Sequence, residues 1–149
     1  MNAIEDFTLP ATGNQRFSSA VFRGHRYVLY FYPKDDTPGC TLEGTQFKAL
    51  HGEFLEAGVM VFGVSRDSVV SHERFKAKMG YPFDLLSDPD ETVCKLFDVI
   101  REKSLYGRKY MGVDRSTFLM GPRHEILREW RSVKVDGHAA AVLEAVKSV

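Results

Sequence analysis

Hydrophobic and polar positions along the chain form blocks that predict strands followed by helices. Two runs rich in β-branched and aromatic residues, 27–32 and 59–65, predict buried central strands. Each run precedes an amphipathic stretch that predicts a helix, over residues 38–57 and 68–79, and a glycine suited to a helix C-terminus follows each stretch. Strands that alternate with helices in this way predict a mixed sheet covered on both faces.

The C-terminal half carries shorter signals. Residues 83–86 predict a short strand, and Asp88 is suited to cap a helix that opens at Pro89. Residues 116–130 predict a hairpin around a Gly-Pro turn, and residues 138–147 predict a last helix. The pattern alone fits several three-layer α/β folds.

Length and composition predict one folded domain over residues 1–149. Hydrophobic residues make up 44% of the sequence and include eleven Phe, which is enough for a packed core. Twenty basic and twenty acidic residues give a formal charge of zero, so no basic surface for nucleic acid is expected.

No membrane segment and no secretion signal are expected. No apolar run approaches the roughly 20 residues that cross a bilayer. The first six residues lack the basic start and the apolar core of a signal peptide. The expected compartment is the cytoplasm, where thiols stay reduced, so two cysteines indicate chemistry or packing before they indicate a disulfide.

Cys40 lies where a predicted helix starts. Thr37 is placed to cap this helix with its side chain, and Pro38 suits the first helical position. Cys40 then falls in the first turn, near unpaired backbone N–H groups and the positive end of the helix dipole, which favour the reactive thiolate. A small cysteine packed beneath the helix is the alternative, but the adjoining Pro38 and Gly39 favour a functional turn.

The residues around this thiol resemble a known motif. Pro33-x-x-x-Thr37-x-x-Cys40, followed by Glu43, is similar to the peroxidatic motif of the peroxiredoxins. Within that family, the sequence of residues 31–41 resembles that of the peroxiredoxin Q branch, also called bacterioferritin comigratory protein.

Two later segments, residues 106–119 and 133–138, resemble the same branch, so the resemblance covers nearly the whole chain. It implies an α/β, thioredoxin-like fold with a mixed central β-sheet flanked by helices on both faces. It also implies a thiol-dependent peroxidase that reduces hydrogen peroxide and organic hydroperoxides, the Cys40 thiolate becoming sulfenic acid.

Stabilising the departing oxygen is the larger part of this chemistry. Lowering the pKa of a thiol from about 8.5 to about 6 raises its reactivity at neutral pH only about two- to threefold, because nucleophilicity falls with pKa. Donors that are in place before the reaction contribute orders of magnitude. The backbone N–H of Gly39 or Cys40 could face the peroxide, and the hydroxyl of Thr37 is either such a donor or only a helix cap.

Three further residues belong to the expected site, Arg115 as a catalytic residue and Glu43 and Pro33 as supporting residues. The resemblance implies that Arg115 contacts thiolate and peroxide, where a forked guanidinium suits a spread oxygen anion better than lysine would. It also implies that Glu43 holds this arginine, although pairing with the helix dipole is the commoner role of a first-turn glutamate. Pro33 is expected to shape the pocket wall.

The chain departs from the branch at the second cysteine. Many members carry it five positions after the first, where this chain has Thr45, and others carry it in the next helix, where residues 71–80 have none. Cys94 is the only other thiol, and its apolar neighbours predict a structural role. We therefore expect a one-cysteine cycle regenerated by an external thiol: thioredoxin, or glutaredoxin with glutathione.

Two alternatives to this cycle remain at the level of sequence. One is a two-cysteine peroxidase with a Cys40–Cys94 disulfide, which requires the two Cα atoms to lie within about 7 Å. The other is a thiol–disulfide oxidoreductase, although Cys40 lacks a Cys-x-x-Cys partner on either side. A non-catalytic binding module on the same fold is the alternative to enzymatic activity altogether. The branch resemblance implies a monomer.

Other site types find no support in the sequence. The five histidines are scattered, with no short-spaced Cys/His cluster, so neither a metal nor a cofactor is expected. Gly107-Arg108-Lys109 lacks the spacing of a phosphate loop. His138 is expected at the surface or as a capping residue of the last helix. Trp130 and the aromatics of 106–110 are expected in the core or in a pocket wall.

Overall fold

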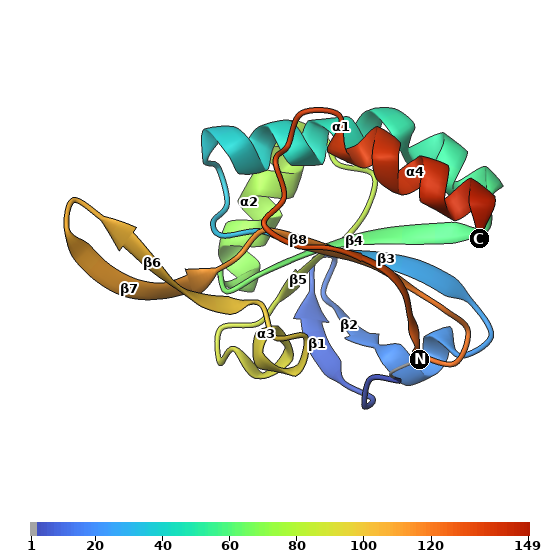
Figure 1. Cartoon of the computed structure of the whole chain (residues 1–149). Coiled ribbons are helices and arrows are strands. Elements are labelled where there is room, and N and C mark those ends of the chain that lie inside the picture. The colour runs from blue at the N-terminus through green and yellow to red at the C-terminus, as the bar shows by residue number, and fades with distance from the viewer. Residues whose placement is uncertain (1–2) are drawn as a thin grey trace.

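A mixed β-sheet forms the centre of the molecule (Figure 1), which we describe from a computed structural model. The structure describes residues 3–149; Met1 and Asn2, which open the segment considered for a signal peptide, lie outside the described residues. Within that range, seven strands pair in the order β2-β1-β5-β4-β3-β8-β9. Their bounds are β1 Thr8–Ala11, β2 Gln15–Ser18, β3 Arg26–Phe31, β4 Val59–Ser65, β5 Leu85–Ser87, β8 Ser116–Met120 and β9 Ile126–Trp130.

The strand directions make this sheet mixed, as predicted. Strands β3, β4 and β5 run parallel, whereas β8 and β9 are antiparallel neighbours beyond β3 and β1 and β2 are antiparallel neighbours beyond β5. The predictions of the two central strands and of the C-terminal hairpin are confirmed, because each was a strong local signal. The third parallel strand begins at Leu85, two residues later than predicted.

Two pairs of strands were not predicted. Strands β1 and β2 have four residues each, too few for a clear alternation. Strands β6 (Ile100–Leu105) and β7 (Arg108–Val113) form a separate two-stranded sheet whose side chains are mostly exposed, with charged and apolar residues in no regular alternation, so no apolar period marks them. A short 3₁₀ helix, Ser19–Phe22, follows β2.

Helices cover both faces of the sheet. Figure 1 shows α1 (Pro38–Glu56) and α4 (His138–Ser148) side by side on one face, and α3 (Thr92–Leu96) lies on the opposite side. Helix α2 (Val69–Met79) ends at Gly80 in the left-handed conformation, as predicted. Ser68, predicted as the first helical residue, is instead the N-cap, and its side chain accepts a hydrogen bond from the Ser71 N–H. None of the helices within residues 3–149 is long and apolar enough to cross a membrane.

The start of α3 differs from the prediction. The carboxylate of Asp88 does accept backbone hydrogen bonds, but from the N–H groups of Val93 and Cys94 at 3.3 and 2.7 Å, so the helix begins at Thr92 rather than at Pro89. Glu91 precedes the helix in a left-handed conformation with φ of 62°. A loop of several residues therefore separates the capping side chain from the first helical turn.

Two hydrophobic cores lie on the two faces of the sheet. The core under α1, α2 and α4 contains Cys40 and a stack of Tyr30 on Phe47 with ring centroids 4.6 Å apart. The core on the other face contains Cys94 and an aromatic cluster that includes Phe97 and Phe118, whose centroids are 4.9 Å apart. Each fully buried aromatic side chain contributes about 1.5–3 kcal/mol. The sheet itself therefore separates the two cysteines.

Candidate active site

Cys40 occupies the first turn of α1 and is only 2% exposed. The helix begins with Pro38 at its first position, as the sequence predicts, and its early N–H groups have no helical carbonyl to bond. Thr37 is the N-cap residue, but its predicted side-chain cap is wrong, because its hydroxyl donates to the carbonyl of Lys34 at 2.9 Å. A local turn bond has replaced the cap.

Arg115 lies against this thiol. Its Nη2 is 3.5 Å from Cys40 Sγ, and its Nη1 is 2.6 Å from Glu43 Oε1. Strand β8 pairs with β3 so that Ser116 is opposite Phe31, which brings Arg115 to the end of β3, where the chain turns toward α1. Residues 75 positions apart therefore meet across one sheet edge.

Gly39 makes this approach possible. A Cβ atom added there would lie 3.0 Å from Arg115 Nη2, closer than nine in ten such contacts, so any side chain would displace the guanidinium. Burial acts to lower the pKa of Arg115, but the charges of Glu43 and Cys40 raise the pKa above its usual value. The guanidinium thus stays charged between its two partners.

Glu43 is fully buried beneath the guanidinium. Burial raises its pKa to about 7, although the charge and hydrogen bond of Arg115 act to lower the pKa. Its second oxygen, Oε2, has no hydrogen-bond partner within the described part of the chain. Nε2 of His138 lies 4.0 Å from this oxygen.

His138 is a residue that the sequence analysis placed wrongly. It opens α4, but its ring is buried rather than at the surface, and its Nε2 lies 2.8 Å from the hydroxyl of Thr117. Burial and the nearby Arg115 charge lower the pKa of His138 to about 4, so the ring is neutral at physiological pH. It reaches the site by packing across α1, which no local signal in the sequence reveals.

A second polar cluster anchors the loop between β3 and α1. The carboxylate of Asp35 accepts hydrogen bonds from Tyr32 and Ser71 at 2.6 and 2.7 Å, and it lies 2.7 Å from Nδ1 of His72. Burial acts to raise the pKa of Asp35, but the hydrogen bond and charge of His72, with those hydroxyl bonds, hold the pKa below its usual value. Asp67 binds the Asp35 backbone N–H at 2.9 Å.

This cluster brings together groups of the kind that can bind a metal, although they lie far apart in the sequence. Three potential ligand atoms lie within 4.8 Å of one another, one each from Asp35, Asp67 and His72. The ring of His72 is held on both sides, by Asp35 and by the carbonyl of Leu86 at 2.9 Å. Because these atoms already bond to protein groups, the arrangement is that of a loop anchor.

Cys94 is far from this chemistry. It is fully buried in the core on the opposite face of the sheet, and burial, with the neighbouring Asp88, raises the pKa of its thiol. Both cysteines are free thiols. Their separation by the sheet favours the structural role expected for Cys94.

Of the aromatic residues expected in the core or in a pocket wall, those at 106–110 are exposed, whereas Trp130 is half-buried. Pro33 is half-buried where β3 ends and the loop begins. The aromatics at 106–110 are not core: Tyr106 is 97% exposed and Tyr110 is also exposed, because strands β6 and β7 extend away from the sheet. Trp130 is half-buried at the end of β9, with its ring packed edge-on against His138.

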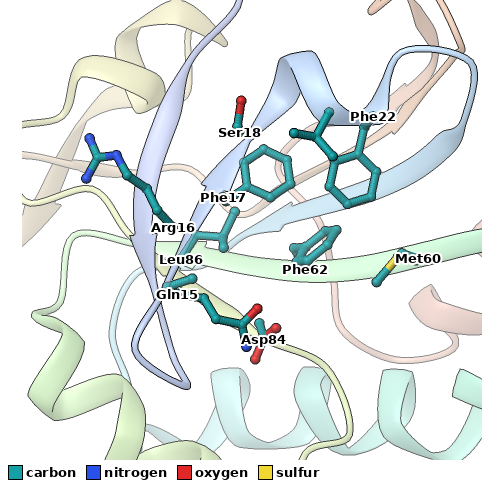
Figure 2. A pocket seen from close by; sticks show the side chains of 11 residues that line it. Gln15, Arg16, Phe17, Ser18, Phe22, Met60, Phe62, Asp84 and Leu86 are labelled. Carbon is teal, nitrogen blue, oxygen red and sulfur yellow. The ribbon is translucent and has the colours of Figure 1, made fainter.

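A pocket of about 230 Å³ lies elsewhere, near β2 and β4 (Figure 2). Its apolar wall consists of Phe17, Phe22 and Phe62, which pack on one another with centroids 4.9–5.4 Å apart. None of the residues described around Cys40 lines it. This pocket is the open end of the aromatic core and not part of the thiol site.

The sequence model of the AhpC/TSA family matches residues 1–128. The chain therefore belongs to this family, whose members include the peroxiredoxins.

Individual relatives show which branch of this family the chain is most similar to. Peroxiredoxin Bcp of Xanthomonas campestris is 52% identical over 98% of this chain and 91% of its own length. Peroxiredoxin Bcp of Bacillus subtilis is 40% identical over 97% of this chain and 92% of its own. A solved structure of X. campestris peroxiredoxin Q superposes with a TM-score of 0.91 at 51% identity and covers 95% of this chain and 90% of that one.

These relatives confirm the resemblance to the peroxiredoxin Q branch and the thioredoxin-like fold. The chain is accordingly an enzyme of the peroxiredoxin class, a peroxidase among the oxidoreductases.

Proposed function

We propose that the chain reduces hydrogen peroxide and organic hydroperoxides with Cys40 as the attacking thiol. The observation that carries this proposal is the single guanidinium of Arg115, which lies 3.5 Å from the buried Cys40 sulfur and is held by Glu43 at 2.6 Å. A solved structure of the X. campestris relative is described in terms of its alkyl peroxide reduction activity.

The first step transfers one oxygen atom to sulfur. The Cys40 thiolate attacks the terminal oxygen of the peroxide, the O–O bond breaks, and the sulfur becomes sulfenic acid. The other oxygen leaves as hydroxide or alkoxide and takes a proton to become water or an alcohol. Arg115 stabilises the thiolate before attack and the departing oxygen afterwards, since its fork presents donors to both.

Thr37 and the first-turn backbone complete the pocket. Because the hydroxyl hydrogen of Thr37 is used in the bond to Lys34, its oxygen presents lone pairs and can accept the peroxide O–H. The N–H groups of Gly39 and Cys40, at the helix N-terminus, provide donors for the oxygen that carries negative charge. Pro33 walls the loop side of this pocket.

The second half of the cycle uses one cysteine. An external thiol condenses with the sulfenic acid and releases water, and a second thiol then cleaves the mixed disulfide and restores the Cys40 thiol. The position of Cys94 on the opposite face of the sheet supports this cycle over an internal Cys40–Cys94 disulfide. Thioredoxin, or glutaredoxin with glutathione, is the proposed reductant class.

We also propose that residues 1–149 act as one domain and as a monomer, in the reducing cytoplasm that suits two free thiols. Size-exclusion chromatography with light scattering tests the oligomeric state.

Intact-mass spectrometry under non-reducing conditions, after one equivalent of peroxide, tests the thiol cycle. A sulfenic acid trapped on Cys40 with a dimedone-type reagent is the expected product. Loss of two mass units without dimerisation would instead indicate a Cys40–Cys94 bond. Cys40→Ser should abolish peroxide consumption, whereas a Cys40→Ser variant as active as the wild type would refute the proposal.

A further inference from the structure

Strands β6 and β7 form an arm, residues 100–113, that pairs with no other strand of the described residues 3–149. Figure 1 shows the arm extending away from the rest of the chain, beneath the first turn of α1. A two-stranded hairpin is only marginally stable in water by itself, and its exposed strand edges are available for pairing with another chain.

The tip of the arm displays an aromatic side chain in a restricted backbone conformation. Tyr106 is 97% exposed and has a φ of 51°, and Gly107 follows at 76°, so the two residues make a tight left-handed turn. Glycine and asparagine favour such positions, whereas a bulky residue there is uncommon. Strain of this kind concentrates at functional segments.

The arm is also unusually apolar for an exposed segment. Ten large hydrophobic side chains are exposed within residues 3–149, and four of them belong to the arm: Leu105, Tyr106, Tyr110 and Met111. Because successive strand residues point to opposite faces, Leu105 and Tyr110 share one face of the arm with their cross-strand partners Arg108 and Lys103, whereas Met111 lies on the other face. Exposed apolar groups on one face mark interaction surfaces, and tyrosine and arginine are enriched where binding energy concentrates.

The charge of the arm is positive. It carries four basic residues, Arg101, Lys103, Arg108 and Lys109, against one acidic residue, Glu102, which makes +3 in a chain of zero net charge. Asp98, just before the arm, pairs with Arg101 at 2.8 Å, so the unbalanced charge is +2 and comes from the other three basic residues. An acidic surface complements this charge, whereas two copies of the arm facing each other would repel. The composition therefore favours an acidic protein partner over a second copy of this chain.

The arm also adjoins the thiol site. Strand β7 ends at Val113, two residues before Arg115. Lys103 is near enough for the charges of Arg115 and Cys40 to act on it. A protein seated on the arm would therefore have its own reactive groups beside Cys40.

We propose that the arm is the docking surface for an acidic, small disulfide-reductase protein that regenerates Cys40. The inference rests on the proposed function and names the partner of the same site. A thiolate of the docked protein attacks Cys40 Sγ of the sulfenic acid, and water leaves. Its second thiol then attacks the mixed disulfide, so that Cys40 is released as a thiol and the partner is oxidised to a disulfide.

Steady-state kinetics with two reductants separates docking from chemistry. The test variant combines Tyr106→Asn, which suits the left-handed turn, with Arg108→Glu and Lys109→Glu; the matched control combines Val21→Asn with Arg123→Glu and Lys147→Glu, exposed positions outside the arm. The reductants are thioredoxin, or glutaredoxin with glutathione, each kept reduced by its own system, and dithiothreitol as the small thiol.

We expect the arm variant to raise the KM for the protein reductant about tenfold or more, as loss of an interface anchor does, with kcat little changed. Its turnover with dithiothreitol and its single-turnover oxidation by peroxide should stay within about twofold of wild type, and so should the control variant with either reductant. Added salt should raise the wild-type KM for the protein and flatten its difference from the variant.

Three outcomes would overturn the docking proposal: an unchanged KM for the protein reductant, an equal loss with dithiothreitol, or a wild-type enzyme that dithiothreitol regenerates but neither protein does. Absence of peroxide consumption with every reductant is a different result, because it refutes the proposed function itself.

Discussion

Glu43 and His138, two buried neighbours, should contribute to the pH dependence of stability with opposite signs. The folded chain keeps the Glu43 proton up to a pKa of about 7, whereas the free side chain has a pKa of 4.5. Between these values the folded chain binds more protons than the unfolded chain, so the Glu43 contribution to the free energy of unfolding falls as pH rises. This contribution is fully present below pH 4.5 and is lost through pH 7.

His138 acts with the opposite sign. Its pKa is about 4 in the folded chain and 6.5 in the unfolded chain, so the unfolded chain binds more protons between these values. The His138 contribution to the free energy of unfolding therefore rises with pH over this interval. Each group contributes at most about 1.4 kcal/mol per pH unit, so over about two units from pH 4.5 to 6.5 each amounts to about 2–3 kcal/mol and the two cancel.

Substituting either residue should leave the pH dependence of stability that the other residue causes. In Glu43→Gln, the free energy of unfolding should rise relative to wild type between pH 4.5 and 6.5, by about 2–3 kcal/mol in total. In His138→Gln it should fall by about the same amount, and the double variant should again follow the wild type. Above pH 6.5 only the Glu43 contribution changes, so the wild type, which is flat below this pH, should begin to lose stability there.

Urea denaturation followed by circular dichroism, at half-unit steps from pH 4.5 to 8, measures these slopes. Fluorescence is less suitable, since the ring of Trp130 lies 6.1 Å from that of His138 and would respond to the substitution directly. If both single variants keep the wild-type slope between pH 4.5 and 6.5, the buried pair does not hold its protons as described.

Three further substitutions test the site. Arg115→Lys should lower kcat/KM for peroxide about 10²- to 10³-fold, because a single ammonium cannot serve thiolate and oxygen together; activity within threefold of wild type, in a peroxide-consumption assay, would contradict this. Gly39→Ala should raise helix stability by up to about 1 kcal/mol in thermal unfolding yet slow peroxide reduction about tenfold, since its Cβ displaces Arg115; equal rates would contradict the steric argument. Cys94→Ala should cost about 1–2 kcal/mol of stability while leaving turnover with dithiothreitol unchanged, and loss of that turnover would point to a Cys40–Cys94 disulfide.

Local rules were sufficient for much of the fold. The two central strands, the glycine end of α2, and the placement of Cys40 in a first helical turn all follow from short stretches of sequence. They succeed because strand runs, helix caps and glycine termini act within a few residues. They fail at α3, where Asp88 caps from a distance, and at the arm, whose exposed strands show no apolar alternation.

What the sequence by itself determined is the chemistry available: a thiol at a helix start, a motif that resembles the peroxiredoxins, and a forked cation at residue 115. Only the tertiary structure decided which side chains these groups contact. The pairing of β8 with β3 brings Arg115 to Cys40, and the packing of α4 over α1 buries His138 beside the unpaired oxygen of Glu43. Contacts between residues many positions apart depend on how whole strands and helices pack, and the free energy of that packing is not contained in any short segment.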